Sequence, residues 1–209
     1  MEDVLDVYKR LYDPFFPVVN MDEMPKQLIG ETRTPIPRKP GQAQRIDYEY
    51  VRNGTANAFM FFSPLHNWRR VSIRKRKTAL DWAYEIKKLV DEDFPDAKKI
   101  VLVMDNLNTH KIASLYKAFK PEEAHRLASK LEIHFTPKHG SWLNMAEIEL
   151  SVLSRQALSK RMNDIETLTK RVETWARKRN EAKGTVDWQF TTEDARIKLR
   201  KLYPSINAN

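Results

Sequence analysis

The sequence predicts an α/β fold in which a central mixed sheet, made of three antiparallel strands plus parallel strands, is flanked by helices. Three observations lead to this fold class. Strand-like segments cluster before residue 78, strand-like and helical segments alternate after it, and residues 98–105 form an almost unbroken aliphatic run that ends in Asp105. Strands that alternate with helices usually pair in parallel, and a strand that is apolar throughout is usually buried on both faces.

The amino-acid composition restricts the kind of protein this can be. Lys and Arg number 37 against 28 Asp and Glu, so the net charge is +9, which favours nucleic acid as a partner over a membrane surface. No apolar run approaches the roughly 18 residues that a spanning helix needs, and the first ten residues are too polar for a signal peptide. We therefore expect a cytoplasmic protein without a membrane partner.

The chain contains no cysteine. This excludes disulfide scaffolds, zinc sites built on thiolates and cysteine nucleophiles. Any metal must be held by carboxylate, imidazole or water, which are ligands that suit hard cations such as magnesium.

The first elements are a leader and a buried strand. Residues 1–16 are interpreted as a leader or the remnant of an upstream linker, ended by prolines at 14 and 17. Residues 17–22 (PVVNMD) predict a buried strand that ends at Asp22. Residues 24–44 carry prolines, glycines and cations without a regular period, and they predict a long basic loop.

Three strands and a helix are expected next. Residues 45–54, 56–64 and 68–75 have strand-like composition, and the Asn53-Gly54 pair predicts a hairpin turn between the first two, so the three should form an antiparallel meander. A helix should begin at Thr78, with Asp81 completing a capping box, and end near Pro95.

The second half alternates between helices and strands. After the core strand at 98–105, residues 111–130 predict one or two helices broken near Pro121, and 131–137 predict a short strand. A helix is expected from about 145 to 160, with Glu147 in its first turn, and another over 166–180.

Three carboxylates are placed to act together. Asp22 and Asp105 each close an apolar strand, and ligands gather at the carboxyl ends of strands in such sheets. Glu147 comes from a helix that can pack against the same edge. Three converging carboxylates repel one another unless cations neutralise them, so the set predicts a magnesium site, and two ions about 4 Å apart suit phosphodiester chemistry.

Each carboxylate also has a plainer interpretation. Asp22 and Asp105 can be ordinary turn or cap residues. Asn144 and Glu147 have the spacing of a capping box, which requires no catalysis. Glu149 lies two residues further along, faces elsewhere on the helix, and is expected to be solvated or salt-bridged.

Three motifs together resemble those of mariner-like DDE transposases, particularly the bacterial insertion-sequence branch. They are VVNMDE (18–23), MDNLNTH (104–110) and SWLNMAEIEL (141–150). In that family the second catalytic Asp is followed by Asn and, five residues on, by His, which here are Asn106 and His110. The third motif places the catalytic Glu three residues after a Leu-Asn pair, which selects Glu147 over Glu149.

The resemblance implies the fold, the reaction and the partners. The fold is ribonuclease H-like, with the catalytic domain at 17–160 and a C-terminal helical extension, 161–209, packed on it. Asp22, Asp105 and Glu147 would hold two Mg²⁺ ions, for which Mn²⁺ can substitute. Hydrolysis at transposon ends would release a 3′ hydroxyl that attacks target DNA. The partners would be double-stranded DNA and a second copy of the chain, in the bacterial cytoplasm at the nucleoid. His110 would contact the metal site, a scissile phosphate or only its own helix.

Two departures from the family pattern keep other functions open. Between Asp105 and Glu147 lie 147 − 105 − 1 = 41 residues, more than is typical, and a helical insertion at 120–130 would leave the site intact. The N-terminal helix-turn-helix region of the family is absent from the sequence. One alternative is therefore an inert DNA-binding or dimerisation remnant of a transposase, and another is a ribonuclease H-like nuclease acting on hybrids or junctions.

A basic segment at residues 67–77 predicts contact with DNA phosphates, with a solvated edge strand as the alternative. Its six cations are Arg69, Arg70, Arg74, Lys75, Arg76 and Lys77. The loop at 33–42 resembles in position the clamp loop that joins subunits in mariner relatives, although a flexible surface loop would have the same sequence. Trp142 is expected to be a packing anchor, with stacking on an unpaired base as the alternative.

Overall fold

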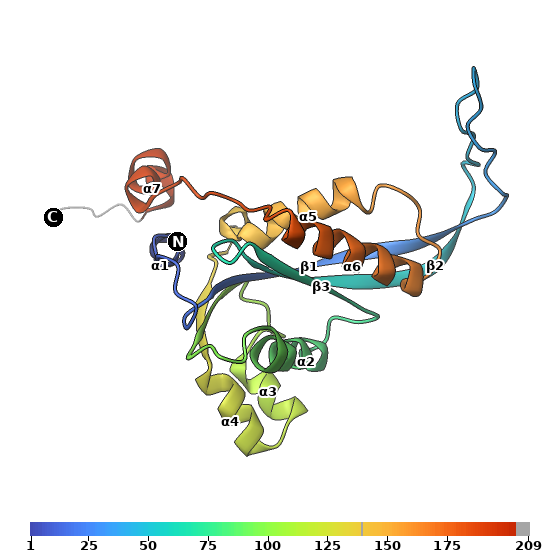
Figure 1. Cartoon of the computed structure of the whole chain (residues 1–209). Helices are drawn as coiled ribbons and strands as arrows, with labels where there is room; N and C mark the ends of the chain where they lie inside the picture. Colours follow the sequence, from blue (N-terminus) through green and yellow to red (C-terminus); the bar gives the residue numbers. More distant parts are fainter. Residues whose placement is uncertain (139, 204–209) are drawn as a thin grey trace.

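The protein is built around one five-stranded mixed sheet. The computed structural model describes residues 1–138 and 140–203, with the strand order β3-β2-β1-β4-β5. β1 pairs antiparallel with β2 and parallel with β4, β2 pairs antiparallel with β3, and β4 pairs parallel with β5 (Figure 1). The predicted fold class is confirmed. The strands are β1 (Val18–Glu31), β2 (Tyr50–Ser63), β3 (Trp68–Arg74), β4 (Ile100–Met104) and β5 (Leu131–Phe135).

Helices cover both faces of the sheet. α2, a π-helical turn that continues it, α3 and α4 lie on one face, while α5 and α6 lie on the other (Figure 1). α1 and α7 pack on each other beside the sheet. The bounds are α1 (Glu2–Tyr8), α2 (Ala79–Lys88), the π turn η1 (Leu89–Asp93), α3 (Ile112–Ala118), α4 (Pro121–Ser129), the 3₁₀ turn η2 (Ser141–Leu143), α5 (Met145–Gln156), α6 (Ile165–Glu181), α7 (Thr192–Lys198) and the 3₁₀ turn η3 (Arg200–Leu202).

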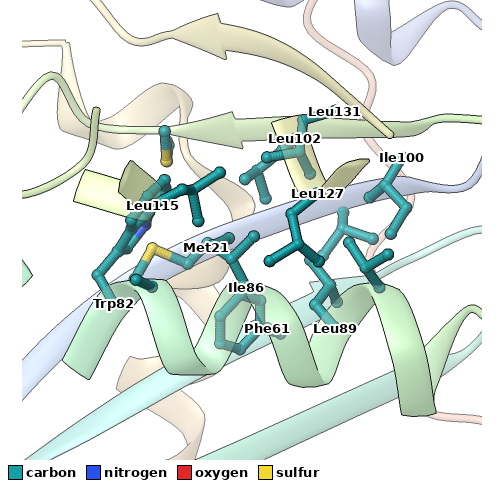
Figure 2. Close-up of a cluster of buried hydrophobic side chains, with 14 of the residues drawn as sticks. Met21, Phe61, Trp82, Ile86, Leu89, Ile100, Leu102, Leu115, Leu127 and Leu131 are labelled. Carbon is teal, nitrogen blue, oxygen red and sulfur yellow. The ribbon is translucent and has the colours of Figure 1, made fainter. Parts of the chain in front are cut away.

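The period-two alternation of β1 and β4 divides the apolar side chains between the two faces. Met21 and Leu102 join the core beneath α2, α3 and α4, where Trp82 and Ile86 of α2 meet them (Figure 2). Val101 and Val103 point to the opposite face and pack with residues of α1 and with Leu143. All five residues of β4 are buried, as the aliphatic run predicts.

β1 extends beyond its predicted end, and the loop predicted for 24–44 is wrong over its first part. The strand continues from Asp22 to Glu31 because β2 pairs with it along this whole length. Pro25 is tolerated inside the strand because pairing with β4 ends at Asn20, so the further half of β1 has a neighbour on one side only.

The predicted hairpin at Asn53-Gly54 is also wrong. Both residues lie inside the continuous strand β2, and its partner is β1 rather than a strand at 56–64. Gln27 pairs with Thr55 and Ile29 with Arg52, so Leu28 faces two residues, Asn53 and Gly54, in a β-bulge. Gly54 has φ +101°, and the bulge uses the positive φ that Asn-Gly more often supplies to a turn.

Residues 32–49 form an arm that projects from the ends of β1 and β2, away from the helices (Figure 1). Isolated bridges join Ile36 to Arg45 and Lys39 to Gln42. Tyr48 is 86% exposed, and Ile36 and Ile46 are about half exposed. The arm therefore presents apolar side chains to solvent at a distance from the core.

The helical predictions in the rest of the chain hold. Thr78 and Asp81 form the predicted capping box of α2, and Pro121 begins α4, so 111–130 is two helices. α5 ends at Gln156, four residues before the predicted end, and α6 packs on β3. The last six residues of the predicted 161–209 extension, and His139, lie outside the described residues. No described helix is long and apolar enough to cross a membrane.

Candidate active site

The parallel register of β1 and β4 brings the two predicted aspartates together. The last paired residues are Asn20 and Val103, and Asp22 and Asp105 each follow two residues later, close enough that the charge of Asp105 acts on Asp22. Asp105 is the first residue after β4, just beyond the point at which the two strands stop pairing. The carboxyl end of β4 thus opens beside β1, which is where ligands bind in sheets of this kind.

The third carboxylate is held at the same edge by the first turn of α5. Asn144 caps this helix, because its side-chain oxygen accepts from the Ala146 N–H at 3.1 Å. The amide of Asn144 donates to the carbonyl of Met21 at 2.8 Å, beside Asp22. This bond fixes the start of α5, and so Glu147, to the strand that carries Asp22.

A buried tyrosine secures the same junction from α1. The hydroxyl of Tyr8 lies 2.5 Å from the side-chain oxygen of Asn20 and 2.6 Å from the carbonyl of Leu143. Burial raises the pKa of Tyr8, so the hydroxyl stays protonated. α1 is thus bonded both to β1 and to the turn before α5.

The pKa of Asp22 is shifted by burial and by the charges of its neighbours. Burial raises its pKa to about 7, a hydrogen bond from the Glu23 N–H at 2.7 Å opposes the rise, and the negative charges of Asp105, Glu147 and Glu23 add to it. The three predicted carboxylates therefore lie close enough for their charges to act at one point. A positive ion at this point would relieve both the burial and the repulsion.

The three side chains do not yet form a ligand shell. Across residues 1–138 and 140–203, no three His, Asp or Glu side chains are gathered tightly enough to hold a metal ion. Asp22 accepts from the Glu23 N–H, and Asp105 faces His110. Mutual repulsion keeps uncompensated carboxylates apart. As a donor set, three carboxylates still fit Mg²⁺ or Mn²⁺, which prefer oxygen ligands.

The predicted capping box at α5 is only half formed. Asn144 caps the helix, but it does so through the Ala146 N–H, without the reciprocal bond from Glu147. The carboxylate of Glu147 therefore takes no part in capping α5, so the capping box does not explain why a glutamate stands at this position.

His110 is buried between two carboxylates. Its Nδ1 lies 2.6 Å from Oδ1 of Asp105 and its Nε2 lies 2.9 Å from Oε1 of Glu23. Burial alone would lower its pKa, but hydrogen bonding to Asp105 and Glu23, with their charges, raises it to about 9. The ring is therefore protonated at neutral pH and donates to both. No role for Glu23 is predicted from the sequence, although this residue lies inside the first motif.

The sequence predicts that Glu149 is either solvated or salt-bridged, and the structure shows that it is salt-bridged. Its side chain is also completely buried. Its oxygens accept from Arg179 of α6 at 2.6 and 3.1 Å, and Nε of Arg69 on β3 lies 3.3 Å away. The carboxylates of Glu149 and Glu147 thus have different surroundings, the first tying α5 to α6 and β3. A helical position two residues on points to a different side.

The prediction that the cations of the basic segment bind DNA is wrong for Arg69 and is weakened for two others. Arg69 is 1% exposed, so its guanidinium cannot reach a phosphate. Arg70 pairs with Glu85 and Asp93, and Arg74 pairs with Glu85. These partners come from α2 and η1, which the local sequence of β3 does not reveal. Lys75, Arg76 and Lys77 are exposed and follow the end of β3.

Trp142 lies in η2, directly before α5, and is 41% exposed. Its ring meets that of Phe190 edge to face, with centroids 5.6 Å apart. The indole is therefore partly packed, as a packing anchor requires, and partly exposed beside the third motif.

Comparison with known proteins gives the same family. The sequence profile described as "DDE superfamily endonuclease" matches residues 17–181, well over half of the chain. No curated protein matches the sequence.

Solved structures share the fold at low identity. The Mos1 mariner paired end complex with Mn is 16% identical with TM-score 0.58, and the match covers 86% of this chain and 54% of that one. The Mos1 strand transfer complex is 16% identical with TM-score 0.56, covering 83% and 50%. A pre-cleavage Mos1 transpososome is 14% identical with TM-score 0.54, covering 88% and 60%. The chain thus spans about half the length of these proteins, and it belongs to the DDE superfamily endonucleases.

Proposed function

We propose that this chain is the catalytic domain of a DNA transposase, which cleaves and joins DNA strands at transposon ends with the help of divalent metal ions. Asp22, Asp105 and Glu147 are the proposed metal ligands. The observation that carries the proposal is the convergence of these three carboxylates at one sheet edge: burial raises the pKa of Asp22 to about 7, and the negative charges of Asp105 and Glu147 add to that rise. The match to the endonuclease family and the fold shared with mariner complexes support it.

The reaction consists of two displacements at phosphorus. Water first breaks a P–O3′ bond at the transposon end and leaves a 3′ hydroxyl. That oxygen then attacks a phosphodiester of target DNA, forming one P–O bond and releasing one target 3′ hydroxyl. Divalent ions, when bound, supply the Lewis acidity that this chemistry needs. Asp22, Asp105 and Glu147 would hold the ions, and the sheet edge would fix the positions of these carboxylates.

The proposed partners are double-stranded DNA and a second copy of the chain. The net charge of +9 and the exposed Lys75, Arg76 and Lys77 favour a phosphate backbone. The arm at 32–49, with its exposed apolar side chains, is the proposed contact with the second copy. Residues 161–203 are proposed to belong to the same domain, since α6 packs on β3.

The experiment uses two supercoiled plasmids, one carrying the genomic DNA that flanks the coding sequence and one without it. The proposal expects nicking and joining at the flanks in Mg²⁺ or Mn²⁺, and none in EDTA. Asp22→Asn, Asp105→Asn and Glu147→Gln should each lower the rate by at least about 100-fold while the domain stays folded. Glu173→Gln, an exposed carboxylate on α6, is the control.

The same assay separates the alternatives. Cleavage of an RNA–DNA hybrid, without action on the flanking DNA, would favour a ribonuclease H-like nuclease. Salt-sensitive DNA binding with no cleavage in either metal would favour an inert remnant. Full activity of Asp105→Asn would remove the proposed site.

A further inference from the structure

The row Glu23–His110–Asp105 lies directly behind one of the proposed metal ligands. Three elements contribute to it, since Glu23 belongs to β1, His110 precedes α3 and Asp105 follows β4. The side chain of His110 is 1% exposed and that of Glu23 is 3% exposed. The ring of Trp82 on α2 stacks on His110, with centroids 6.0 Å apart and planes at 28°. The imidazole is therefore held on both edges and on one face.

Such a row is a costly way to fill a core. Burying charged groups carries a desolvation penalty that their mutual attraction often only balances, so apolar side chains of the same volume would serve packing as well. Glu23 is not even fully satisfied, because its buried Oε2 has no hydrogen bond and is met only by an ion pair with Lys77 Nζ at 3.8 Å. A contribution to folding stability therefore explains the arrangement poorly. An effect on the orientation of the Asp105 carboxylate explains it better.

The geometry defines that effect. The Nδ1–H of His110 is bonded to Oδ1 of Asp105, while the side chain of Asp105 stays 34% exposed at the sheet edge. A carboxylate bonded through one oxygen cannot rotate freely about its Cβ–Cγ bond, so its other oxygen keeps one direction. Partners of this kind orient metal-ligating groups in many proteins, and their loss typically costs 10- to 100-fold in metal affinity.

We propose that His110 and Glu23 are positioning residues for metal binding: Glu23 fixes the imidazole, and the imidazole fixes the carboxylate of Asp105. The inference rests on the proposed function, since it requires Asp105 to be a metal ligand. His110 itself touches neither substrate nor metal in this scheme. A purely structural role, in which His110 only anchors the start of α3, would change stability and leave metal affinity unaltered.

The structure supplies a matched control. His134 on β5 also bridges two carboxylates, with Nδ1 2.8 Å from Asp3 and Nε2 3.0 Å from Glu132. Neither partner is one of the proposed ligands. His134→Ala therefore removes a bridge between two carboxylates without removing a contact of any proposed ligand.

The test measures Mn²⁺ binding by calorimetry on the full chain, alongside thermal unfolding without metal and plasmid nicking. His110→Ala should weaken Mn²⁺ binding by about 10- to 100-fold. His110→Asn, whose amide can replace Nδ1–H, should recover most of that loss. Glu23→Gln should cause a smaller loss than His110→Ala, and His134→Ala should bind Mn²⁺ as the wild type does.

Equal Mn²⁺ affinity in His110→Ala and the wild type, or no recovery in His110→Asn, would overturn the inference. If His110→Ala does not fold, the Asn and Gln variants decide by the same comparison. Mn²⁺ binding without any nicking by the wild type would count against the transposase function but leave positioning to be judged by affinity. A wild-type chain that binds no Mn²⁺ would overturn both.

Discussion

At the scale of single residues, two nearby carboxylates on one helix have different electrostatic surroundings. Glu147 and Glu149 both lie on α5, yet Glu149 is fully buried between Arg69 and Arg179 whereas Glu147 is partly exposed and acts on Asp22. The first arrangement stabilises the packing of α5 on α6 and β3. The second adds repulsion to a buried site, which is tolerated where a cation is to be bound.

This difference predicts opposite outcomes for two similar substitutions. Glu149→Ala should lower the free energy of unfolding by about 3 kcal/mol or more, because it leaves two arginines without their buried partner. Glu147→Ala should change stability by less than about 1 kcal/mol but abolish nicking. Urea unfolding and the plasmid assay measure the two effects, and a stable but inactive Glu149→Ala would reverse our assignment.

Asp22 predicts an unusual dependence of stability on pH. Its pKa is about 7 in the folded protein, against an ordinary value of 3.8. Between these values the folded state holds a proton that the unfolded state has lost, so stability falls as pH rises from about 4 to 7 and then levels off. The loss is on the order of 2 kcal/mol, after discounting for the partial exposure of Asp22.

Asp22→Asn should therefore stabilise the metal-free protein at pH 8 and have little effect at pH 4. Thermal unfolding in EDTA at the two pH values measures this. A pH profile identical in the variant and the wild type would show that Asp22 ionises normally. Added Mn²⁺ at pH 8 should raise the melting temperature of the wild type more than that of the variant.

At the scale of elements, the local sequence predicts a segment correctly when its pattern is compatible with only one kind of secondary structure. The aliphatic run of β4 can only be a buried strand, and the Thr78 capping box marks the start of α2. The structure confirms both predictions. Asp105 and Glu147 could be placed near the site because each lies at the end of such an element.

The incorrect predictions concern residues whose local sequence is compatible with more than one structure. The pair Asn53-Gly54 supplies positive φ to either a turn or a bulge, and only the partner strand β1 decides between them. Arg69 resembles a surface cation until Glu149, 80 positions later, is seen beside it. Glu23 has no local signal for a role, since its partner His110 comes from another part of the chain.

The basic segment predicts a DNA contact that is confined to its end. Neutralising Lys75, Arg76 and Lys77 together should weaken DNA binding and reduce the slope of log K against log salt by at most about 3, since each phosphate contact contributes about 0.9. A fluorescence titration over a range of salt measures the slope. The control variant neutralises three exposed cations near the C-terminal end, Lys198, Arg200 and Lys201. An equal loss of DNA affinity in this variant would mean that only the net charge of the chain determines binding.

At the scale of the whole molecule, the arm is the part that the fold itself does not need. Residues 32–49 have exposed apolar side chains and lie away from the helices and the core (Figure 1). A monomer gains nothing by exposing Ile36, Ile46 and Tyr48, whereas a second copy would cover them.

If the arm makes the proposed contact with a second copy, replacing residues 33–48 by a two-residue turn should convert the proposed dimer into a monomer in light scattering. Mn²⁺ affinity should stay within about threefold of the wild type, because the ligands lie on the body of the domain. The substitution Tyr48→Ser tests the same contact with the arm intact. A shortened chain that is still dimeric would place the subunit contact elsewhere.

One strand joins the arm to the carboxylates. β1 carries Asp22 near its beginning and enters the arm after Glu31, nine residues later, a span of roughly 30 Å. A strand hardly stretches, and a slip by one residue would turn Asp22 toward the wrong face. The bulge opposite Leu28 opposes such a slip. A partner bound to the arm would therefore restrain the far end of β1, and through this strand the position of Asp22, a proposed metal ligand.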